Sequence, residues 1–574
     1  MTTSYDAIAM NNRPATGAGT KFPAGANLLD HIERMIRVRG GGESCQTVEL
    51  RRKGNSPVDV RIFFRGKEWL TTPAAEEFLS DLAGDAAVAG TRRKGPAISI
   101  RFTDDFIDEL GGMLESGDTA TLDPPEVLAG QCYAVGFAGP NTSKALHIGH
   151  LRNITIGSAL ASALAAAGAD VIRQSLVGDI GRNICEAMAG LAIFHPDGIP
   201  ADVKPDRLIG ECYARYIRES SGGAASDGNS DDPAMRETMV SNDLADIYMR
   251  QLLAGDPDVR SFWRRTRDMV LDGHRQTLER FGIVIDRCDY ESDAMEDIPA
   301  LMEHGLRSGI LRREDDGTVI YESGRAEFET MVLVRNDGFP TEHARLLGVY
   351  YRMFAEWRSG RRYIDLSGTE WQPASALHTE LLQRLRPELM FGTHILLFHG
   401  MVMLRNMKMS SSEGGAPLID DLLEQLGRVP EIRLLADSSG GTVDAGAVAN
   451  ILVKSFFLCR PHIKPMEFSW DLLLQEDNPG WAIARTWCMV QRPEDGEGTF
   501  DPESYRLAVI RSQDFCRNLA GVAESLSLAG PASYLLHFCE DILASSSFDP
   551  RLRGVARTVL RRGMRSLGLA GDDR

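Results

Sequence analysis

Two predicted strands joined by a helix constrain the fold of this chain more than any other feature. Cys132–Ala138 reads as a buried strand, the segment His147–Ala167 as a helix closed by Gly168, and Asp170–Val177 as the next strand. Two strands linked by a crossover helix form a βαβ unit, and such units make parallel sheets. The sequence therefore predicts an α/β fold with a Rossmann-like parallel sheet.

Two histidines stand at the start of that predicted helix, in His147-Ile148-Gly149-His150. Their spacing of three residues puts both side chains on one face of a helix. Unpaired N–H groups at a helix start favour phosphates, and Gly149 leaves room for a nucleotide to approach the backbone. Alone, the pattern is explained equally well by two surface histidines. Its place in a βαβ unit favours an ATP triphosphate site.

A second polar segment follows far downstream, where Lys408-Met409-Ser410 precedes a run of serines and glycines. Flexible loops with lysine and serine can stabilise charge that develops on phosphates. On its own, this tripeptide does not indicate a function. Downstream of a histidine pair in a βαβ unit, it indicates a second phosphate-binding segment.

The composition is that of a multidomain globular chain: 574 residues, 43% hydrophobic and 25% charged. No apolar run could span a bilayer and no secretory signal is evident, so we expect no membrane association and a cytoplasmic location. The nine cysteines are scattered without a C-x-x-C pair, which predicts reduced thiols and no metal held by protein ligands. The net charge of −18 argues against a general nucleic-acid-binding surface but permits a local basic one.

Composition and periodicity divide the chain into four predicted parts. We expect a disordered tail over residues 1–21, and a small α+β domain over residues 22–121 that opens with a helix at Leu28–Val38. The parallel-sheet domain is predicted over residues 122–427. The pattern then turns mostly helical, which predicts an all-α domain over residues 428–574.

Together these motifs resemble those of the class I aminoacyl-tRNA synthetases. The run Gly139–Asn153 is similar to the sequence S-P-N-x-x-K-P-L-H-x-G-H-L-R of the arginyl-tRNA synthetases. Other segments that resemble the family are Asp170–Gln174, Gly178–Gly181, Asp337–Thr341 and Gly400–Val402. The resemblance implies a catalytic Rossmann-like domain, an appended N-terminal domain that contacts tRNA, and a C-terminal anticodon-binding-like domain.

The resemblance also implies an activity. ATP and an amino acid, arginine in the family, would form an aminoacyl-adenylate, and the amino acid would pass to tRNA. Mg²⁺ would arrive with ATP, and we expect a monomer. The implied catalytic residues are His147, His150, Lys144 and Lys408. Those implied to bind ATP are Gly149, Gly400, Met401, Val402, Met409 and Ser410.

Lys144 matters because the chain departs from many class I enzymes in the second segment. Those enzymes carry a second lysine two residues after the methionine, where this chain has Ser411. In arginyl enzymes a lysine before the histidines is thought to compensate, and Lys144 occupies that place. We expect it to contact phosphate rather than to be an ordinary surface lysine.

The implied amino-acid pocket departs further from the family. Asn141 would hold the α-amino group, but the family's glutamate, tyrosine and aspartate fall on Gly136, Glu342 and Leu346. A buried arginine side chain needs carboxylate partners. Glu342, one helical turn before Leu346, could supply one or could be an ordinary exposed acid.

Three functions stay open on the sequence alone. The chain could be an arginine–tRNA ligase with an unusual pocket. It could be a paralogue that activates another amino acid, or that transfers it to a non-tRNA acceptor in an amide-forming biosynthetic step. It could also be a non-catalytic tRNA-binding protein, although the joint retention of Asn141, Lys144, His147, His150 and Lys408 argues against that.

Overall fold

The chain divides into two compact units. One comprises Met1–Leu122 with Gly496–Asp514 and Ser545–Thr558, and the other Asp123–Asp495 with Phe515–Ala544 and Val559–Arg574. The computed structural model describes residues 27–570, except for 40, 43–44, 51–57, 67, 124–126, 221–243, 325–329, 358–359, 390–393, 406–416, 494–497 and 546. The predicted tail over residues 1–21 lies outside the described residues, and the four-part division stays a prediction.

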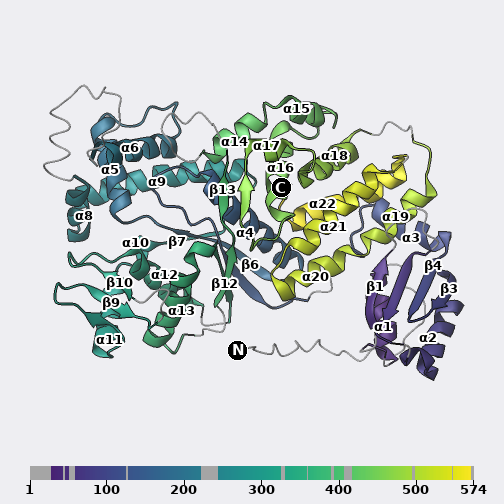
Figure 1. The fold of residues 1–574 in the computed structure, drawn as a ribbon. Coiled ribbons are helices and arrows are strands. Elements are labelled where there is room, and N and C mark those ends of the chain that lie inside the picture. The colour runs from purple at the N-terminus through teal and green to yellow at the C-terminus, as the bar shows by residue number, and fades with distance from the viewer. Residues whose placement is uncertain are drawn as a thin grey trace. The chain divides into compact units, whose positions relative to one another are not determined.

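The first unit contains an antiparallel four-stranded sheet in the order β1-β2-β4-β3 (Figure 1). Val60 and Ile62 of β2 pair with Ile100 and Ile98 of β4, and all four are buried, so one face of this sheet packs into a core. Its strands are β1 (Cys45–Leu50), β2 (Val60–Phe64), β3 (Val88–Lys94) and β4 (Ala97–Phe102). Its helices are α1 (Leu28–Val38), as predicted, η1 (Trp69–Thr71), α2 (Pro73–Gly84), α3 (Asp104–Glu115) and α19 (Pro502–Ser512).

The second unit contains a five-stranded parallel sheet in the order β12-β11-β5-β6-β7 (Figure 1). The predicted βαβ unit forms its centre, because β5 and β6 pair side by side and α4 connects them. This confirms the predicted α/β fold class. The elements are β5 (Cys132–Gly136), α4 (Ile148–Ala166), β6 (Asp170–Val177), β7 (Arg287–Tyr290), β11 (Arg362–Gly368) and β12 (His394–His399).

Two boundaries differ from the sequence prediction. The strand predicted to reach Ala138 ends at Gly136, because Ala138 adopts a left-handed backbone with φ of 55°, which no strand continues. Asn153 and Ser175 bond the backbone of Ala138 and hold this turn. The helix predicted from His147 begins at Ile148, with His147 as its N-cap residue.

Helices and a small second sheet cover the parallel sheet. Ala134 of β5 and Tyr363 of β11 share a buried core with α12 and α13, while α4 packs against β5, β6 and β11. The elements around this core are α10 (Glu291–Ala294), α11 (Ile298–Arg307), β8 (Arg312–Arg313), β9 (Val319–Glu322), β10 (Thr330–Val334), α12 (Glu342–Glu356), η2 (Thr369–Trp371) and α13 (Gln372–Leu385).

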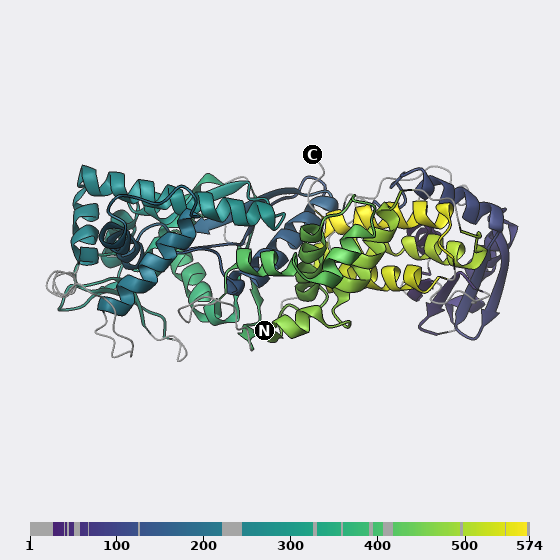
Figure 2. The same ribbon diagram turned by 90° about the horizontal axis from the view of Figure 1, so that it is seen from above.

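Between β6 and β7 the chain forms a helical insertion. Its helices lie side by side as a bundle in both views (Figures 1 and 2). They are α5 (Arg182–Phe194), α6 (Pro205–Ser220), α8 (Leu244–Ala254) and α9 (Pro257–Arg280).

The remainder of the chain is mostly helical, with one short parallel pair of strands, as the sequence predicts. No helix among the described residues combines the length and apolarity needed to cross a membrane. All nine cysteines are free. The elements are β13 (Val402–Leu404), α14 (Ile419–Leu426), α15 (Pro430–Asp437), α16 (Ala445–Leu458), β14 (Met466–Phe468), α17 (Trp470–Leu474), α18 (Pro479–Gln491), α20 (Phe515–Ser525), α21 (Ala529–Leu543) and α22 (Pro550–Ser566).

Candidate active site

His147 and His150 lie against each other at the start of α4. The His147 backbone N–H donates to Nδ1 of His150 at 3.1 Å, and the Gly149 N–H donates to Nδ1 of His147 at 3.2 Å. The ring centroids are 4.0 Å apart. This reciprocal cap fixes both rings and occupies both Nδ1 atoms.

Both histidines are neutral at physiological pH. Burial, with a smaller contribution from nearby Lys144, lowers the pKa of His147 to about 4. Burial lowers the pKa of His150 to about 3, with added repulsion from neighbouring His147, His274 and Lys144. A neutral ring whose Nδ1 accepts a hydrogen bond carries its proton on Nε2. Each ring therefore offers one N–H donor.

Residues of the helical insertion contact the backbone of Lys144. The Lys144 side chain is exposed. Nε2 of His274, on α9, lies 2.8 Å from the Lys144 carbonyl oxygen. Burial lowers the pKa of His274 to about 4, so its ring is neutral and donates through Nε2. On α6, a side-chain carbon at Gly210 would lie 3.2 Å from Cα of Lys144, so the two backbones approach closely. The expected phosphate lysine thus sits on a supported turn beside the histidines.

The segment after the predicted Lys408-Met409-Ser410 motif returns to the histidines. The motif itself lies outside the described residues, but Pro417 accepts a bond from the Ile148 N–H at 2.9 Å, and the Ile419 N–H donates to Leu146 at 3.1 Å. The base of the second segment is therefore paired with the start of α4.

Gly400, Met401 and Val402, which the resemblance implies to bind ATP, are tied to the same helix by Arg152. Its guanidinium donates to the carbonyl oxygens of Gly400 and His462 at 2.7 and 2.8 Å, although the side chain is fully buried. Further bonds reach the carbonyls of Met401 and Pro461. Arg152 therefore fixes two turns of backbone to the histidine helix.

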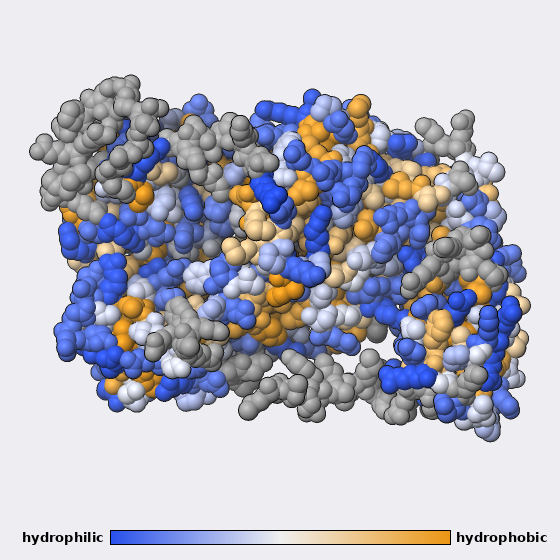
Figure 3. All heavy atoms as spheres, viewed as in Figure 1, coloured by the Kyte–Doolittle hydropathy of each residue, from blue (hydrophilic) through white to orange (hydrophobic). Residues whose placement is uncertain are grey.

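Met401 itself is 55% exposed, and hydrophobic residues gather around β13 on the face shown in Figure 3. Gly400 is required where it lies, because a side-chain carbon there would collide with the Lys464 backbone. Val402 begins β13. These three residues form an apolar edge beside the helix that carries the histidines.

Asn141 and Gly178 follow β5 and β6, at the carboxyl edge of the sheet where parallel folds bind ligands. The two residues form an isolated parallel bridge, and the Thr142 N–H donates to the Gly178 carbonyl at 2.9 Å. A side chain at Gly178 would collide with the Asn141 amide. The Asn141 side chain is exposed at this edge.

The surroundings of Gly136 explain why this position has no carboxylate. A side-chain carbon there would collide with the hydroxyl of Tyr363, which leans across from β11. Asp365 of β11 and Gln174 of β6 are the cross-strand neighbours of Gly136, so both lie on its face of the sheet. Asp365 is 8% exposed and accepts a 2.7 Å bond from the Tyr350 hydroxyl. A buried carboxylate therefore lies one strand away from the position where the family has glutamate.

Several buried polar atoms near Asp365 have no hydrogen-bond partner among the described residues. They are Oη of Tyr363, Oε1 of Gln174 and Oγ of Ser367. Buried polar atoms are nearly always paired. These three oxygens therefore keep hydrogen-bonding capacity for water or a ligand.

The other two expected pocket residues lie on α12 and differ in character. Glu342 is exposed in the first turn, and Leu346 packs partly buried against the core. Between them, buried Arg345 pairs with Glu291, the Arg345 Nε lying 2.5 Å from the carboxylate. Burial raises the pKa of Glu291 to about 7 against the lowering effect of Arg345. Leu346, in contrast to these charged neighbours, packs against the core and brings no charge to the expected pocket.

Arg152, His274 and Asp365 were not among the site residues predicted from the sequence. An arginine inside an otherwise apolar helix was a visible signal for Arg152. Nothing in the sequence marked the other two, because their roles depend on which strand and helix lie beside them.

The catalytic-domain family model "tRNA synthetases class I (R)" matches residues 126–356. An arginine–tRNA ligase from Phocaeicola vulgatus is 28% identical over 305 residues, which cover 51% of this chain and 50% of that protein. The matched part thus spans half the length of that relative. One from Bacteroides fragilis is 26% identical over 485 residues, covering 77% of this chain and 80% of the relative.

Solved structures share the fold. The arginyl-tRNA synthetase of Thermus thermophilus superposes with a TM-score of 0.64 at 19% identity, covering 95% of this chain and 99% of that one. The enzyme of Plasmodium falciparum gives a TM-score of 0.61 at 13% identity, covering 95% and 98%. The family model and the relatives therefore identify residues 126–356 as a catalytic domain of the class I aminoacyl-tRNA synthetases, in the arginyl-tRNA synthetase family.

Proposed function

We propose that the chain activates an amino acid with ATP and transfers it to tRNA. The observation that carries this proposal is the pair of neutral histidines at the start of α4, whose Nδ1 atoms both accept backbone hydrogen bonds, so that each ring carries its proton on Nε2. A carboxylate oxygen of the amino acid would attack the α-phosphorus of ATP, and pyrophosphate would leave. Fixed N–H donors stabilise charge that develops on phosphate oxygens.

Other residues would complete the ATP site. Lys144 would add a positive charge beside the histidines. Gly400, Met401 and Val402 would contact the adenine, held in place by Arg152. Lys408, Met409 and Ser410, from outside the described residues, would contact the phosphates as the family motif implies. Mg²⁺ bound to the triphosphate would neutralise part of its charge.

For the amino acid, we propose a cationic side chain, arginine in the first place. Gly136 and Leu346 remove two expected carboxylates, but Asp365 supplies one on the strand next to Gly136. Unpaired oxygens of Gln174 and Ser367 add acceptors nearby. A guanidinium carries five donors and no acceptor, which suits such a surface. Asn141 would hold the α-amino group.

A second candidate is activation of a different amino acid, or transfer to an acceptor other than tRNA. Two observations favour it: the Tyr363 hydroxyl occupies the space beside Gly136, and Leu346 is apolar. Both changes would suit a shorter or less polar side chain than arginine. Glu342, exposed at the start of α12, argues for neither candidate.

Pyrophosphate exchange with each proteinogenic amino acid, with and without tRNA, tests both candidates. Exchange with arginine supports the first, and exchange with another amino acid supports the second. Exchange with none of them, in either condition, contradicts both and leaves a non-catalytic tRNA-binding protein. Charging of total tRNA with the preferred radiolabelled amino acid then separates tRNA from other acceptors.

A further inference from the structure

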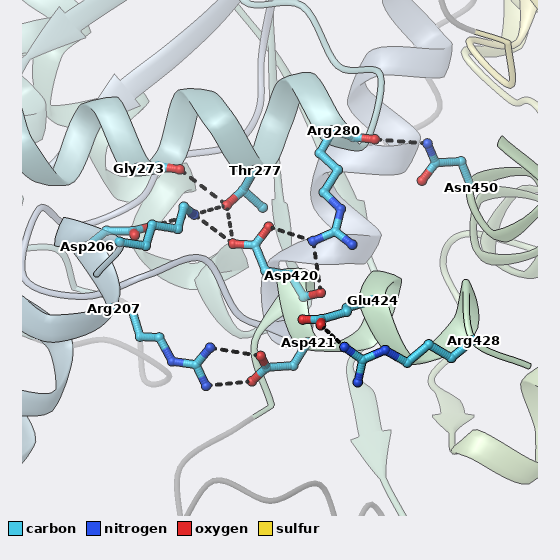
Figure 4. A network of polar contacts seen from close by, with 11 residues as sticks. Asp206, Arg207, Gly273, Thr277, Arg280, Asp420, Asp421, Glu424, Arg428 and Asn450 are labelled. Carbon is cyan, nitrogen blue, oxygen red and sulfur yellow. Dashed lines mark hydrogen bonds and ion pairs between the residues drawn. The ribbon is translucent and has the colours of Figure 1, made fainter. Parts of the chain in front are cut away.

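A polar network outside the ATP site joins α6 and α9 of the helical insertion to the first turn of α14. Nζ of Lys204, the residue before α6, lies 2.6 Å from Oδ2 of Asp420 and 2.5 Å from the Thr277 hydroxyl. Thr277, on α9, also donates to the same carboxylate oxygen at 2.8 Å (Figure 4). Three elements distant in sequence thus meet at the Asp420 carboxylate.

The network is packed tightly on the α6 side. Asp206 is fully buried and pairs with Lys204 at 3.2 Å. A side-chain carbon at Gly273 of α9 would collide with the Asp206 carboxylate, so glycine is required for this approach. Lys204 therefore has one carboxylate within the insertion and another on α14.

A second pair of contacts repeats this connection. Arg207 of α6 binds Asp421 through two bonds, at 3.0 and 3.3 Å, and Arg280 of α9 donates to the Asp420 carbonyl at 3.3 Å (Figure 4). A bidentate arginine–carboxylate pair fixes orientation as well as distance. The first turn of α14 is therefore held in both position and direction.

The residues just before Asp420 carry this placement to the histidines. Leu418 and His147 form an antiparallel bridge, and the Ile419 N–H donates to Leu146. The Ile148 N–H donates back to Pro417. A shift of α14 would therefore shift the backbone from which both histidines project.

The helix α9 reaches the same segment by a second route. His274, one turn before Thr277, donates to the Lys144 carbonyl. The segment from Lys144 to His150 is thus held at its beginning by His274 and along its middle by α14. Both contacts therefore depend on α9, the first through His274 and the second through Thr277, which binds Asp420 of α14.

We propose that Lys204, Thr277 and Asp420 are positioning residues for the phosphate site, acting through α14 on His147 and His150. This inference rests on the proposed activation of an amino acid by ATP. The network fixes the start of α4 against α9, so that the histidine Nε2–H groups and the Lys144 ammonium converge on one phosphate. Misplacement of such groups by about 1 Å can cost about 100-fold in rate.

The first test needs no substrate. Lys204→Met, Asp420→Asn and Thr277→Val each remove one member of the network, and Thr277→Ser keeps the hydroxyl. The matched control is Arg275→Met, on the same helix, where an exposed ion pair with Asp272 and Glu279 is lost instead. In Lys204→Met, Asp420→Asn and Thr277→Val, we expect the rate of hydrogen–deuterium exchange to rise about 10-fold or more. The rise should occur at the amides of Ile148 and Ile419. Thr277→Ser and Arg275→Met should match the wild type.

The second test measures pyrophosphate exchange with the preferred amino acid. We expect kcat to fall about 10- to 100-fold in Lys204→Met and Asp420→Asn, with the KM for the amino acid changed less than about 3-fold. In a His150→Ala background the same changes should have little further effect on kcat, because residues that act through one another are not additive. Thr277→Val keeps the shape of the side chain and leaves the Lys204–Asp420 contact in place. It therefore carries the test if Lys204→Met or Asp420→Asn does not fold.

Wild-type amide exchange at Ile148 and Ile419 in Lys204→Met would overturn the proposal, whatever the activity. The proposal would also be overturned if the network changes lowered kcat by the same factor in the His150→Ala background as in the wild type. The network would then act at a place other than His150. If the wild type activates no amino acid, the proposed function fails, and the amide-exchange result still decides whether the network holds the histidine segment.

Discussion

The two halves of the candidate site are built in different ways. In the ATP half, the key geometry comes from backbone: a helix start, a reciprocal histidine cap and carbonyls gathered by Arg152. In the amino-acid half, it comes from side chains on neighbouring strands, where Tyr363 has entered the space beside Gly136 and Asp365 lies across from it. A site built from backbone leaves a local sequence motif, whereas a site built from side chains on neighbouring strands leaves none, because it depends on which strands are neighbours.

The largest expected effect tests the ATP half. His150→Ala removes one neutral N–H donor and the acceptor that caps His147. We predict that the rate of pyrophosphate exchange falls about 100-fold or more, as for other donors to developing charge. The measurement is steady-state exchange at saturating ATP and amino acid. Near wild-type activity would refute a role of His150 at phosphate.

The next effect tests the amino-acid half. Asp365→Asn keeps the shape of the side chain and its bond from Tyr350 but removes the buried charge. We predict that kcat/KM for a cationic amino acid falls about 10- to 100-fold, with KM for ATP unchanged. Glu342→Gln, the same change at an exposed carboxylate, is the matched control and should alter kcat/KM less than about 3-fold. A larger effect of Glu342→Gln than of Asp365→Asn would reverse our assignment of the pocket.

A smaller effect is expected where the ATP half depends on Arg152. Arg152→Lys retains the charge but cannot reach four carbonyl oxygens at once. We predict that KM for ATP rises about 10-fold while the KM for the amino acid stays within about 2-fold. Titration of ATP at fixed amino acid checks this. Equal changes in both constants would mean that Arg152 supports the whole sheet rather than the adenine side.

The smallest expected effect concerns pH: neither His147 nor His150 should titrate near neutral pH. Burial lowers the pKa of His147 to about 4 and of His150 to about 3, so ring proton signals in NMR should not shift between pH 5.5 and 8. The unfolded chain binds protons on these histidines below about pH 6.5, which the folded chain does not. Their contribution to stability is therefore complete above about pH 6.5 and declines as the pH falls toward about 4 for His147 and about 3 for His150. A midpoint near pH 6.5 for either ring would contradict the neutral phosphate site.

Much of the fold followed from local pattern. The strand, helix and strand around the histidines were predictable because period and capping residues are local properties of the chain. The early end of β5 was not, since Ala138 takes a left-handed conformation that its residue type disfavours. Asn153 and Ser175, distant in sequence, hold it there.

The candidate site was predictable to a different extent in its two halves. His147, Gly149 and His150 formed a recognisable motif. Asp365 could not be selected among the acids of the chain, because the order β11-β5-β6 decides which residue faces Gly136. His274 had the same difficulty, as its partner is a backbone carbonyl more than a hundred residues away.

Activation at the histidine pair is tested by pyrophosphate exchange with the wild type and His150→Ala in parallel, with arginine and with each other amino acid, with and without tRNA. We expect exchange that depends on a cationic amino acid and is nearly lost in His150→Ala. Exchange that is equal in the two proteins, or that requires no amino acid, would contradict it.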